Sequence, residues 1–178
     1  MGISYAEAER LINLYFNAYP GVKEYIENSH NMAIWNNFVI TPFGQRKQQF
    51  GTMPVFEKTA VFNGALRNSQ NVRIQGPTST LGLYCFAKVN EAVKPRGALC
   101  ISTVYDSLEL EVPIERAAEV LEIAFYYMND YPVEVFDWLT LPIGTEAEIG
   151  YNWGDAEVVH RGSSQEEILR ILEKTSRH

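Results

Sequence analysis

The chain has 178 residues, 46% of them hydrophobic, and a formal net charge of −7. No apolar stretch approaches the ~20 residues that a membrane-spanning helix needs, and the N-terminus lacks the charged-then-apolar order of a signal peptide. Two cysteines, Cys85 and Cys100, exclude a disulfide framework and predict buried thiols in a reducing compartment. We therefore expect a cytoplasmic globular protein of one domain, or one and a half, with no membrane partner.

The N-terminal part of the sequence predicts two helices and a short strand. Ser4 and Glu7 have the spacing of a capping box, and apolar residues then recur with a helical period. Pro20 ends this helix and begins a second one that runs to about Asn36. Residues 38–41 predict a short strand, which a turn connects to a basic loop.

The central part of the sequence predicts two long helices. Pro54 is expected to open a helix that runs to about Gln75. Because a proline inside a helix removes a hydrogen bond and clashes with the preceding turn, we expect a break at Gly76-Pro77. A separate helix then follows from Pro77 to Val93.

The C-terminal half predicts a β-hairpin. Strands at residues 98–104 and 108–112 are joined at Tyr105-Asp106-Ser107, and Leu99, Ile101 and Thr103 share one face. A helix from Pro113 to about Asp130, a strand at residues 144–151 and a charged helix from residue 163 complete the chain. A helical segment followed by an antiparallel hairpin backed by helices indicates an α+β fold.

The charge is unevenly distributed along these elements. Residues 1–41 carry −2 and residues 101–178 carry −11, whereas residues 42–100 hold eight basic and two acidic residues, giving +6. A basic segment in an acidic chain is typical of a phosphate-binding surface, because each Lys or Arg against a phosphate releases a counterion. A solvated helix face whose cations pair with acids elsewhere explains the pattern equally well.

Asp106 is the candidate metal ligand. An aspartate at the end of a rigid hairpin suits Mg²⁺, which prefers oxygen ligands and keeps most of its waters. Aspartate is also a favoured turn residue, and without further information the residues favour that interpretation.

Arg67, Asn71 and Gln75 are the candidate nucleic-acid ligands, because their spacing of four places a guanidinium and two amides on one helix face. Such a row suits a groove, where Arg takes phosphates and the amides take base edges. A solvent-facing polar stripe is the alternative, and Gln75 lies at the expected helix break. Arg46 and Lys47 on the preceding loop are either further phosphate contacts or a solvated turn.

In order and spacing, these segments resemble the C-terminal part of family A (DNA polymerase I-like) DNA polymerases. The resemblance covers about residues 2–157 and rests on five motifs. These are Gly2-Ile3-Ser4 with Tyr19-Pro20-Gly21-Val22; Thr41–Lys47, similar to Thr-Leu-Phe-Gly-Arg-Arg-Arg; Arg67, Asn71 and Ile74-Gln75-Gly76; Val104–Ser107, similar to Val-His-Asp-Glu; and Asn152-Trp153.

The resemblance implies a partial fingers segment at residues 1–53 and a palm segment with the catalytic hairpin at residues 54–157. Residues 158–178 form a C-terminal extension with a helix, which either docks a partner or is a solvated appendage. The implied activity is DNA-directed DNA polymerisation in the cytoplasm of a bacterium or a phage-infected host.

The resemblance also implies the roles of the site residues. Asp106 is one of two carboxylates that hold Mg²⁺ for two-metal nucleotidyl transfer. Arg67, Asn71 and Gln75 contact primer-template DNA, Lys47 with Arg46 contacts the template backbone, and Tyr105 lies beside the primer terminus in place of the family's histidine. Ser107 departs from the family's glutamate, which removes one carboxylate from the site.

The family's first palm aspartate and its nucleotide-binding fingers helix belong upstream of the Gly-Ile-Ser segment. We therefore expect the chain alone to be inactive. It would be one piece of a split polymerase, with a second polypeptide supplying both parts and binding deoxynucleoside triphosphates, and it would leave an apolar face for that partner. The alternatives are a non-catalytic DNA-binding remnant of a polymerase and a protein-interaction domain without nucleic acid.

Overall fold

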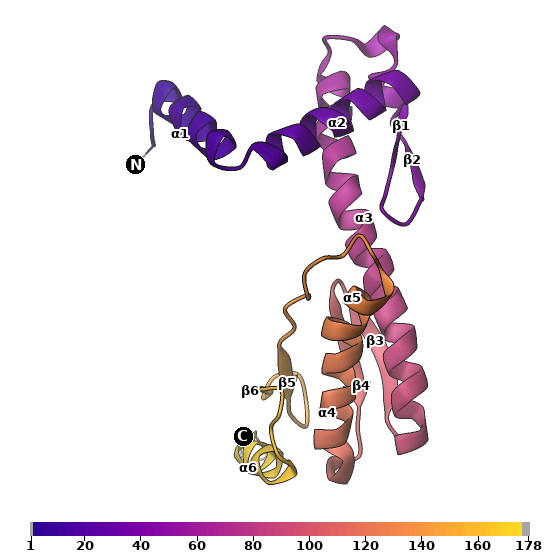
Figure 1. The fold of residues 1–178 in the computed structure, drawn as a ribbon. Coiled ribbons are helices and arrows are strands. Elements are labelled where there is room, and N and C mark those ends of the chain that lie inside the picture. The colour runs from indigo at the N-terminus through magenta and orange to yellow at the C-terminus, as the bar shows by residue number, and fades with distance from the viewer. Residues whose placement is uncertain (1, 176–178) are drawn as a thin grey trace. The chain divides into compact units, whose positions relative to one another are not determined.

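The structure is a computed structural model that describes residues 2–175, so Met1 and the last three residues of the predicted C-terminal extension lie outside the described residues. The fold is α+β, as predicted, and the described residues form long helices and three two-stranded antiparallel sheets (Figure 1). It divides into two compact units, residues 1–77 and 78–178, and the boundary lies inside one helix. The predicted functional segments, with limits at residues 53 and 157, stay a prediction. None of the described helices combines the length and hydrophobicity that crossing a bilayer requires.

The first unit begins with two helices at the predicted positions. In α1 (Tyr5–Ala18), the Ser4 hydroxyl accepts a hydrogen bond from the Glu7 amide at 3.2 Å and caps the N-terminus. Helix α2 (Pro20–Asn36) has its proline in the first turn, where the missing N–H costs nothing. It ends at Asn37, whose φ of 56° is the left-handed conformation common at helix C-termini.

A short hairpin follows α2. Strand β1 (Phe38–Ile40) pairs with β2 (Arg46–Gln48) in antiparallel register, Val39 opposite Lys47 and Ile40 opposite Arg46. The prediction that Arg46 and Lys47 lie on a loop was wrong. All three residues of β2 are exposed and polar. The strand therefore lacks the alternation of apolar and polar residues from which a strand is predicted.

The central helix corrects two further predictions. Pro54 opens only the short 3₁₀ helix η2 (Pro54–Phe56), which follows η1 (Phe50–Thr52), and the long helix α3 (Ala60–Val93) begins later. The Thr59 hydroxyl caps α3 by accepting a hydrogen bond from the Phe62 amide at 3.2 Å. Helix α3 runs through Pro77 without a break. A helical proline costs about 3 kcal/mol, and this one is buried in the fold.

The second unit contains the predicted hairpin, now bounded as β3 (Leu99–Val104) and β4 (Ser107–Glu111). Its inner face packs with the end of α3 and with α4 (Ala117–Phe125) in one core. The buried members of that core are Val89, Val93, Ala98 and Val120, and Cys100, Leu108 and Leu110 pack against them. The outer face, with Leu99 and Ile101, is exposed, and the register shifts at Ile101.

The predicted helix after Pro113 consists of four successive segments. These are a 3₁₀ turn, η4 (Ile114–Arg116), then α4, a π-helical segment (Tyr126–Asp130) and α5 (Tyr131–Val135).

The C-terminal extension is part of the second unit. Strand β5 (Ala147–Ile149) pairs with β6 (Glu157–Val159), and α6 (Gln165–Thr175) follows. Ile168 and Leu172 of α6 are buried against Ala117 and Val159. The extension is therefore neither a solvated appendage nor a helix that keeps its apolar face for a partner, because that face is buried within the unit.

Candidate metal ligand and nucleic-acid interface

Asp106 lies at the tip of the β3–β4 hairpin. Val104 and Ser107 form the last pair of the ladder, so Tyr105 and Asp106 alone make the turn. The Ser107 hydroxyl donates a hydrogen bond to the Val104 carbonyl at 2.8 Å and closes it. The Asp106 side chain is exposed and makes no hydrogen bond or ion pair with any described residue. Its carboxylate is therefore available to an external cation.

Tyr105 has an unusual conformation for its residue type. Its φ of 56° is positive, which is rare for a bulky residue outside glycine-like turn positions, and its side chain is 99% exposed. A non-glycine residue in the left-handed conformation costs roughly 1–2 kcal/mol. Because the Tyr105 ring is almost fully exposed, packing against the described residues does not offset this cost. The turn thus presents an aromatic ring with a hydroxyl to solvent, directly beside Asp106.

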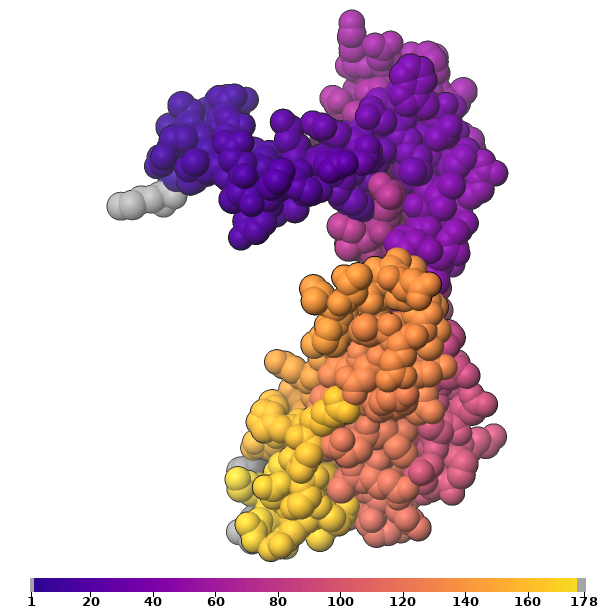
Figure 2. Space-filling model, in the orientation of Figure 1, coloured from indigo at the N-terminus to yellow at the C-terminus, as the bar shows by residue number. Residues whose placement is uncertain are grey.

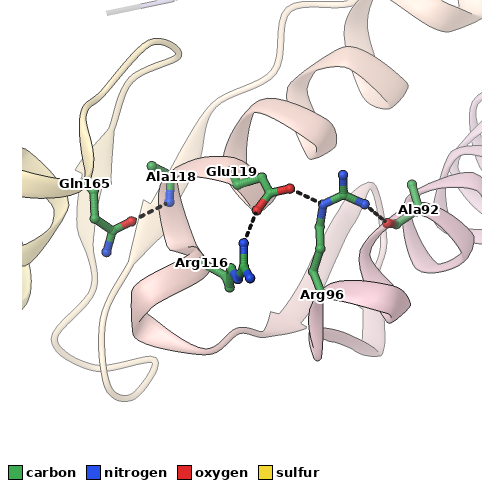
Figure 3. Close-up of polar contacts among 6 residues, drawn as sticks. All are labelled: Ala92, Arg96, Arg116, Ala118, Glu119 and Gln165. Atoms are coloured by element: carbon green, nitrogen blue, oxygen red, sulfur yellow. Dashed lines mark hydrogen bonds and ion pairs between the residues drawn. The ribbon is translucent and has the colours of Figure 1, made fainter.

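Helix α4 supports the hairpin from behind and is fixed at its N-terminal end (Figure 3). Glu119 accepts hydrogen bonds from Arg96 and from Arg116, the latter at 3.0 Å. Arg96 also donates to the Ala92 carbonyl at 2.7 Å, so it links the end of α3 to α4. The hydrogen bond from Arg96 holds the pKa of Glu119 below its usual value.

The extension contributes to the same helix end. The Gln165 side chain donates a hydrogen bond to the Ile114 carbonyl. It also accepts one from the Ala118 amide at 3.1 Å (Figure 3). It thereby satisfies an amide in the first turn of α4, where helical partners are lacking.

Asp106 fits a Mg²⁺ site only in part. Its unpaired carboxylate has the oxygen chemistry that Mg²⁺ prefers. Within residues 2–175, no group of three His, Cys, Asp or Glu side chains is close enough together to hold a metal. Any cation at Asp106 would need most of its oxygen ligands from water, DNA or another polypeptide.

The predicted row on α3 lies on the exposed side of the helix. Arg67, Asn71 and Gln75 are all exposed, and none of their side chains bonds to another described residue. Because α3 continues past Gln75, this residue extends the row instead of projecting at a break. The opposite side of the helix faces α2, where the Tyr25 hydroxyl donates a hydrogen bond to the Gln70 carbonyl at 2.7 Å. The helix thus offers a guanidinium and two amides to a ligand.

The β1–β2 hairpin carries the other two predicted contacts. The Arg46 guanidinium lies 3.8 Å from the centre of the Phe38 ring, a cation–π contact that restricts its position. Lys47 is exposed and makes no ion pair with any residue in the described part of the chain. Its ammonium group is therefore free for a phosphate.

The basic middle of the sequence proves to have mixed roles. Lys88 pairs with Glu91, Arg96 with Glu119, and Arg73 is used within the first unit. The surplus of positive charge belongs to that unit, which has seven basic and five acidic residues, whereas the second has eight and seventeen.

Helix α1 presents an apolar surface to solvent. None of its residues is buried, and Leu11, Ile12, Leu14 and Tyr15 are each about half exposed. Within its unit, α1 contacts little beyond α2 (Figure 2). An exposed apolar surface of this kind is typical of an interaction site.

Comparisons with known proteins agree on one family. The model of DNA polymerase family A matches residues 1–155. The chain is 32% identical to the thermostable DNA polymerase I of Thermus filiformis over 158 residues, and 27% identical to DNA polymerase I of Deinococcus radiodurans over the same length. These matches cover 88% of this chain but only 18% and 16% of the relatives, so the chain corresponds to less than a fifth of their length.

A solved structure shows a similar fold. It is the polymerase domain of Pol1 from M. smegmatis, in complex with DNA primer-template and dNTP. The similarity has a TM-score of 0.66 at 24% sequence identity, and covers 72% of this chain and 23% of that one.

Proposed function

Because this chain belongs to DNA polymerase family A, we propose that it works as the C-terminal part of a DNA-directed DNA polymerase. In this role Asp106 binds Mg²⁺ and the exposed residues of the first unit bind primer-template DNA. The observation that carries the proposal is the position of Asp106, an unpaired carboxylate at the tip of a hairpin whose other end is fixed in a core.

In the proposed role, different residues of the chain bind Mg²⁺ and DNA. Asp106 would hold Mg²⁺ through its carboxylate oxygens. A bound pair of Mg²⁺ ions supplies activation of the primer hydroxyl and charge stabilisation for the leaving pyrophosphate. Arg67 contacts phosphate, and Asn71 and Gln75 contact bases or sugars near the primer terminus.

Lys47 and Arg46 neutralise the template backbone. Arg46 does so with a side chain already oriented on Phe38, and Lys47 with an ammonium group that is free to move. The Tyr105 ring lies against the end of the primer, where its hydroxyl can donate a hydrogen bond.

The chain acts together with a second polypeptide. One carboxylate at the hairpin tip is too few for two cations, so the partner supplies the other palm aspartate and the fingers helix that binds deoxynucleoside triphosphates. The exposed apolar residues of α1 support this proposal, as do Leu99 and Ile101 on the outer face of β3, which are 49% and 58% exposed. Two-stranded sheets are marginal alone, and β3–β4 would gain from a further strand.

A non-catalytic DNA-binding protein is the second candidate, and Ser107 favours it. Its hydroxyl is committed to the Val104 carbonyl and offers no carboxylate to a metal. This candidate keeps the exposed row of α3 and loses only the chemistry.

Primer extension separates the candidates. The chain is mixed with the complementary N-terminal part of a family A polymerase domain, a labelled primer-template, Mg²⁺ and four deoxynucleotides. We expect extension only from the mixture. Asp106→Asn should abolish it, and Asp137→Asn, which changes an exposed aspartate outside the hairpin, should not.

The other outcomes are equally informative. A verified complex that binds DNA and does not extend the primer would leave the non-catalytic DNA-binding protein as the better account. A folded chain without salt-sensitive DNA binding would contradict both candidates and favour a protein-interaction domain.

A further inference from the structure

Arg73 joins three elements of the first unit. From α3, its Nη1 donates a hydrogen bond to the Ser29 hydroxyl of α2 at 2.7 Å, and its Nε donates one to the Ile40 carbonyl of β1 at 3.3 Å. The guanidinium also lies 5.1 Å from the centre of the Tyr25 ring. The partners are 33 to 48 residues away in sequence, so these contacts fix the tertiary arrangement of α2, α3 and β1.

The groups around Arg73 are themselves held in place. Ser29 is fully buried, and its hydroxyl donates its one hydrogen to the Tyr25 carbonyl at 2.8 Å, which leaves the oxygen to accept from Arg73. The Tyr25 hydroxyl donates to the Gln70 carbonyl, and His30 is hydrogen-bonded to the Gln70 side chain at 3.1 Å. Arg73 therefore donates to a polar network whose other members are held in place by their own hydrogen bonds.

The chemistry of this site requires an arginine. No carboxylate among the described residues lies within ion-pair distance of Arg73, so its charge is balanced only by neutral acceptors and an aromatic ring. A guanidinium presents several donors in a rigid plane and can reach both Ser29 and Ile40, whereas a lysine ammonium is a single point on a flexible stem.

The strand that Arg73 holds is the one that orients the cationic hairpin. Ile40 is paired with Arg46 in the β1–β2 register, and Lys47 is the next residue along β2. Arg73 lies between Asn71 and Gln75 in sequence, but its side chain is half-buried and turned toward α2 and β1. It therefore connects the hairpin to the helix that bears the exposed row.

We propose that Arg73 is a positioning residue for DNA binding, which holds Lys47 and Arg46 of the hairpin at a fixed place relative to Arg67, Asn71 and Gln75 without contacting DNA itself. This inference rests on the proposed DNA-binding function of the first unit. The competing role for an uncompensated arginine is a direct phosphate contact.

The salt dependence of DNA binding distinguishes the two roles. Each cation that contacts a phosphate makes the slope of log affinity against log salt concentration more negative by about 0.9. Loss of a residue that only positions other cations lowers the affinity and changes that slope little. Arg73→Met removes charge and donors, and Arg73→Lys keeps the charge. Ser29→Ala keeps Arg73 but removes its acceptor, together with the hydrogen bond from the Ser29 hydroxyl to the Tyr25 carbonyl.

The experiment uses the full chain and a labelled primer-template duplex between 50 and 200 mM salt, with folding verified by circular dichroism. We expect all three variants to bind about threefold to tenfold more weakly with an unchanged slope. In the Arg73→Met background, Lys47→Ala should cost less affinity than in the wild type, whereas Arg67→Ala should cost the same.

Two results would overturn the inference while leaving the proposed function intact. In the first, Arg73→Met makes the negative slope shallower by about 0.9 and Arg73→Lys restores its steepness, which identifies a phosphate contact. In the second, the wild type binds DNA, and the single variants Ser29→Ala and Arg73→Lys each bind it with the same affinity as the wild type. If the wild type itself shows no salt-dependent binding, the proposed function fails and the positioning role fails with it.

Discussion

Ile168→Ala tests whether the C-terminal extension stabilises the unit that carries Asp106. Ile168 is fully buried on α6, where it packs with Ala117 at the start of α4. Helix α4 in turn contributes Val120 to the core that supports the β3–β4 hairpin. The extension lies past residue 155, where the match to the family ends, yet its apolar side chains belong to this packing.

The expected cost follows from the burial of the side chain. Truncation of a fully buried isoleucine to alanine removes its transfer free energy and leaves a cavity, together about 3 kcal/mol within a range of roughly 2–5. The matched control is Leu169→Ala on the same helix, because Leu169 is 41% exposed. A substitution there should change the free energy of unfolding by about 0.5 kcal/mol or less.

Cys85 reports the opening of this unit. It is 3% exposed, and burial raises the pKa of its thiol to about 11. At pH 8 only about one native molecule in a thousand would then carry the reactive thiolate, so labelling by a thiol reagent requires opening. In a Cys100→Ala background, the labelling rate should rise about a hundredfold for Ile168→Ala and about twofold for Leu169→Ala.

Equal labelling rates for the two variants would refute the reasoning. The burial of Ile168 would then contribute nothing to the stability of the unit, and the extension would be the solvated appendage that the sequence left open.

Three further predictions concern the second unit. Tyr105→Asn should raise its free energy of unfolding by roughly 0.5–1 kcal/mol, because asparagine tolerates a positive φ better, and a lower melting temperature would argue against strain at the turn. The hydrogen bond from Arg96 lowers the pKa of Glu119 from its ordinary 4.5, so its stabilising effect is complete above that pH and is lost as pH falls through the lowered value. Glu119→Gln should therefore lose less stability than the wild type on acid titration, and parallel titration curves would be inconsistent with this coupling. Asp106→Asn should remove the Mg²⁺-dependent part of DNA binding by the full chain; an unaltered Mg²⁺ response would count against Asp106 as a ligand.

The sequence predicted the elements whose signals are local. Helices α1 and α2 were recognised from the Ser4 cap and from Pro20, because capping groups and helix-starting prolines act within one turn. The hairpin around Asp106 was recognised from its strand pattern and turn. The α+β fold followed from the order of these elements.

The errors arose where tertiary packing decides. Strand β2 has no buried residue to reveal it, and its pairing with β1 joins two segments that the local pattern of either one does not connect. The continuity of α3 through Pro77 likewise runs against the local cost of a helical proline, at a residue that is buried in the fold.

The candidate site shows the same limit. Arg67, Asn71 and Gln75 were predicted from helical spacing, and the structure places all three on an exposed side. Arg73 was counted among the basic residues of a phosphate-binding surface, because its partners Ser29 and Ile40 are distant in sequence. Charge composition alone does not distinguish a cation that binds a ligand from one that joins two elements.

The hairpin tip argues for chemistry over simple DNA binding. An ionised carboxylate beside phosphates opposes binding by roughly 1 kcal/mol at 4 Å even in water, so a protein that only grips DNA gains nothing from Asp106. Tyr105 adds backbone strain beside it, and its ring is 99% exposed among the residues that the structure describes. A bound cation would offset the repulsion between the carboxylate and the phosphates, and a primer end would give the exposed ring a partner. The combination of an unpaired anion and a strained, exposed aromatic residue therefore supports the metal-dependent function that we propose.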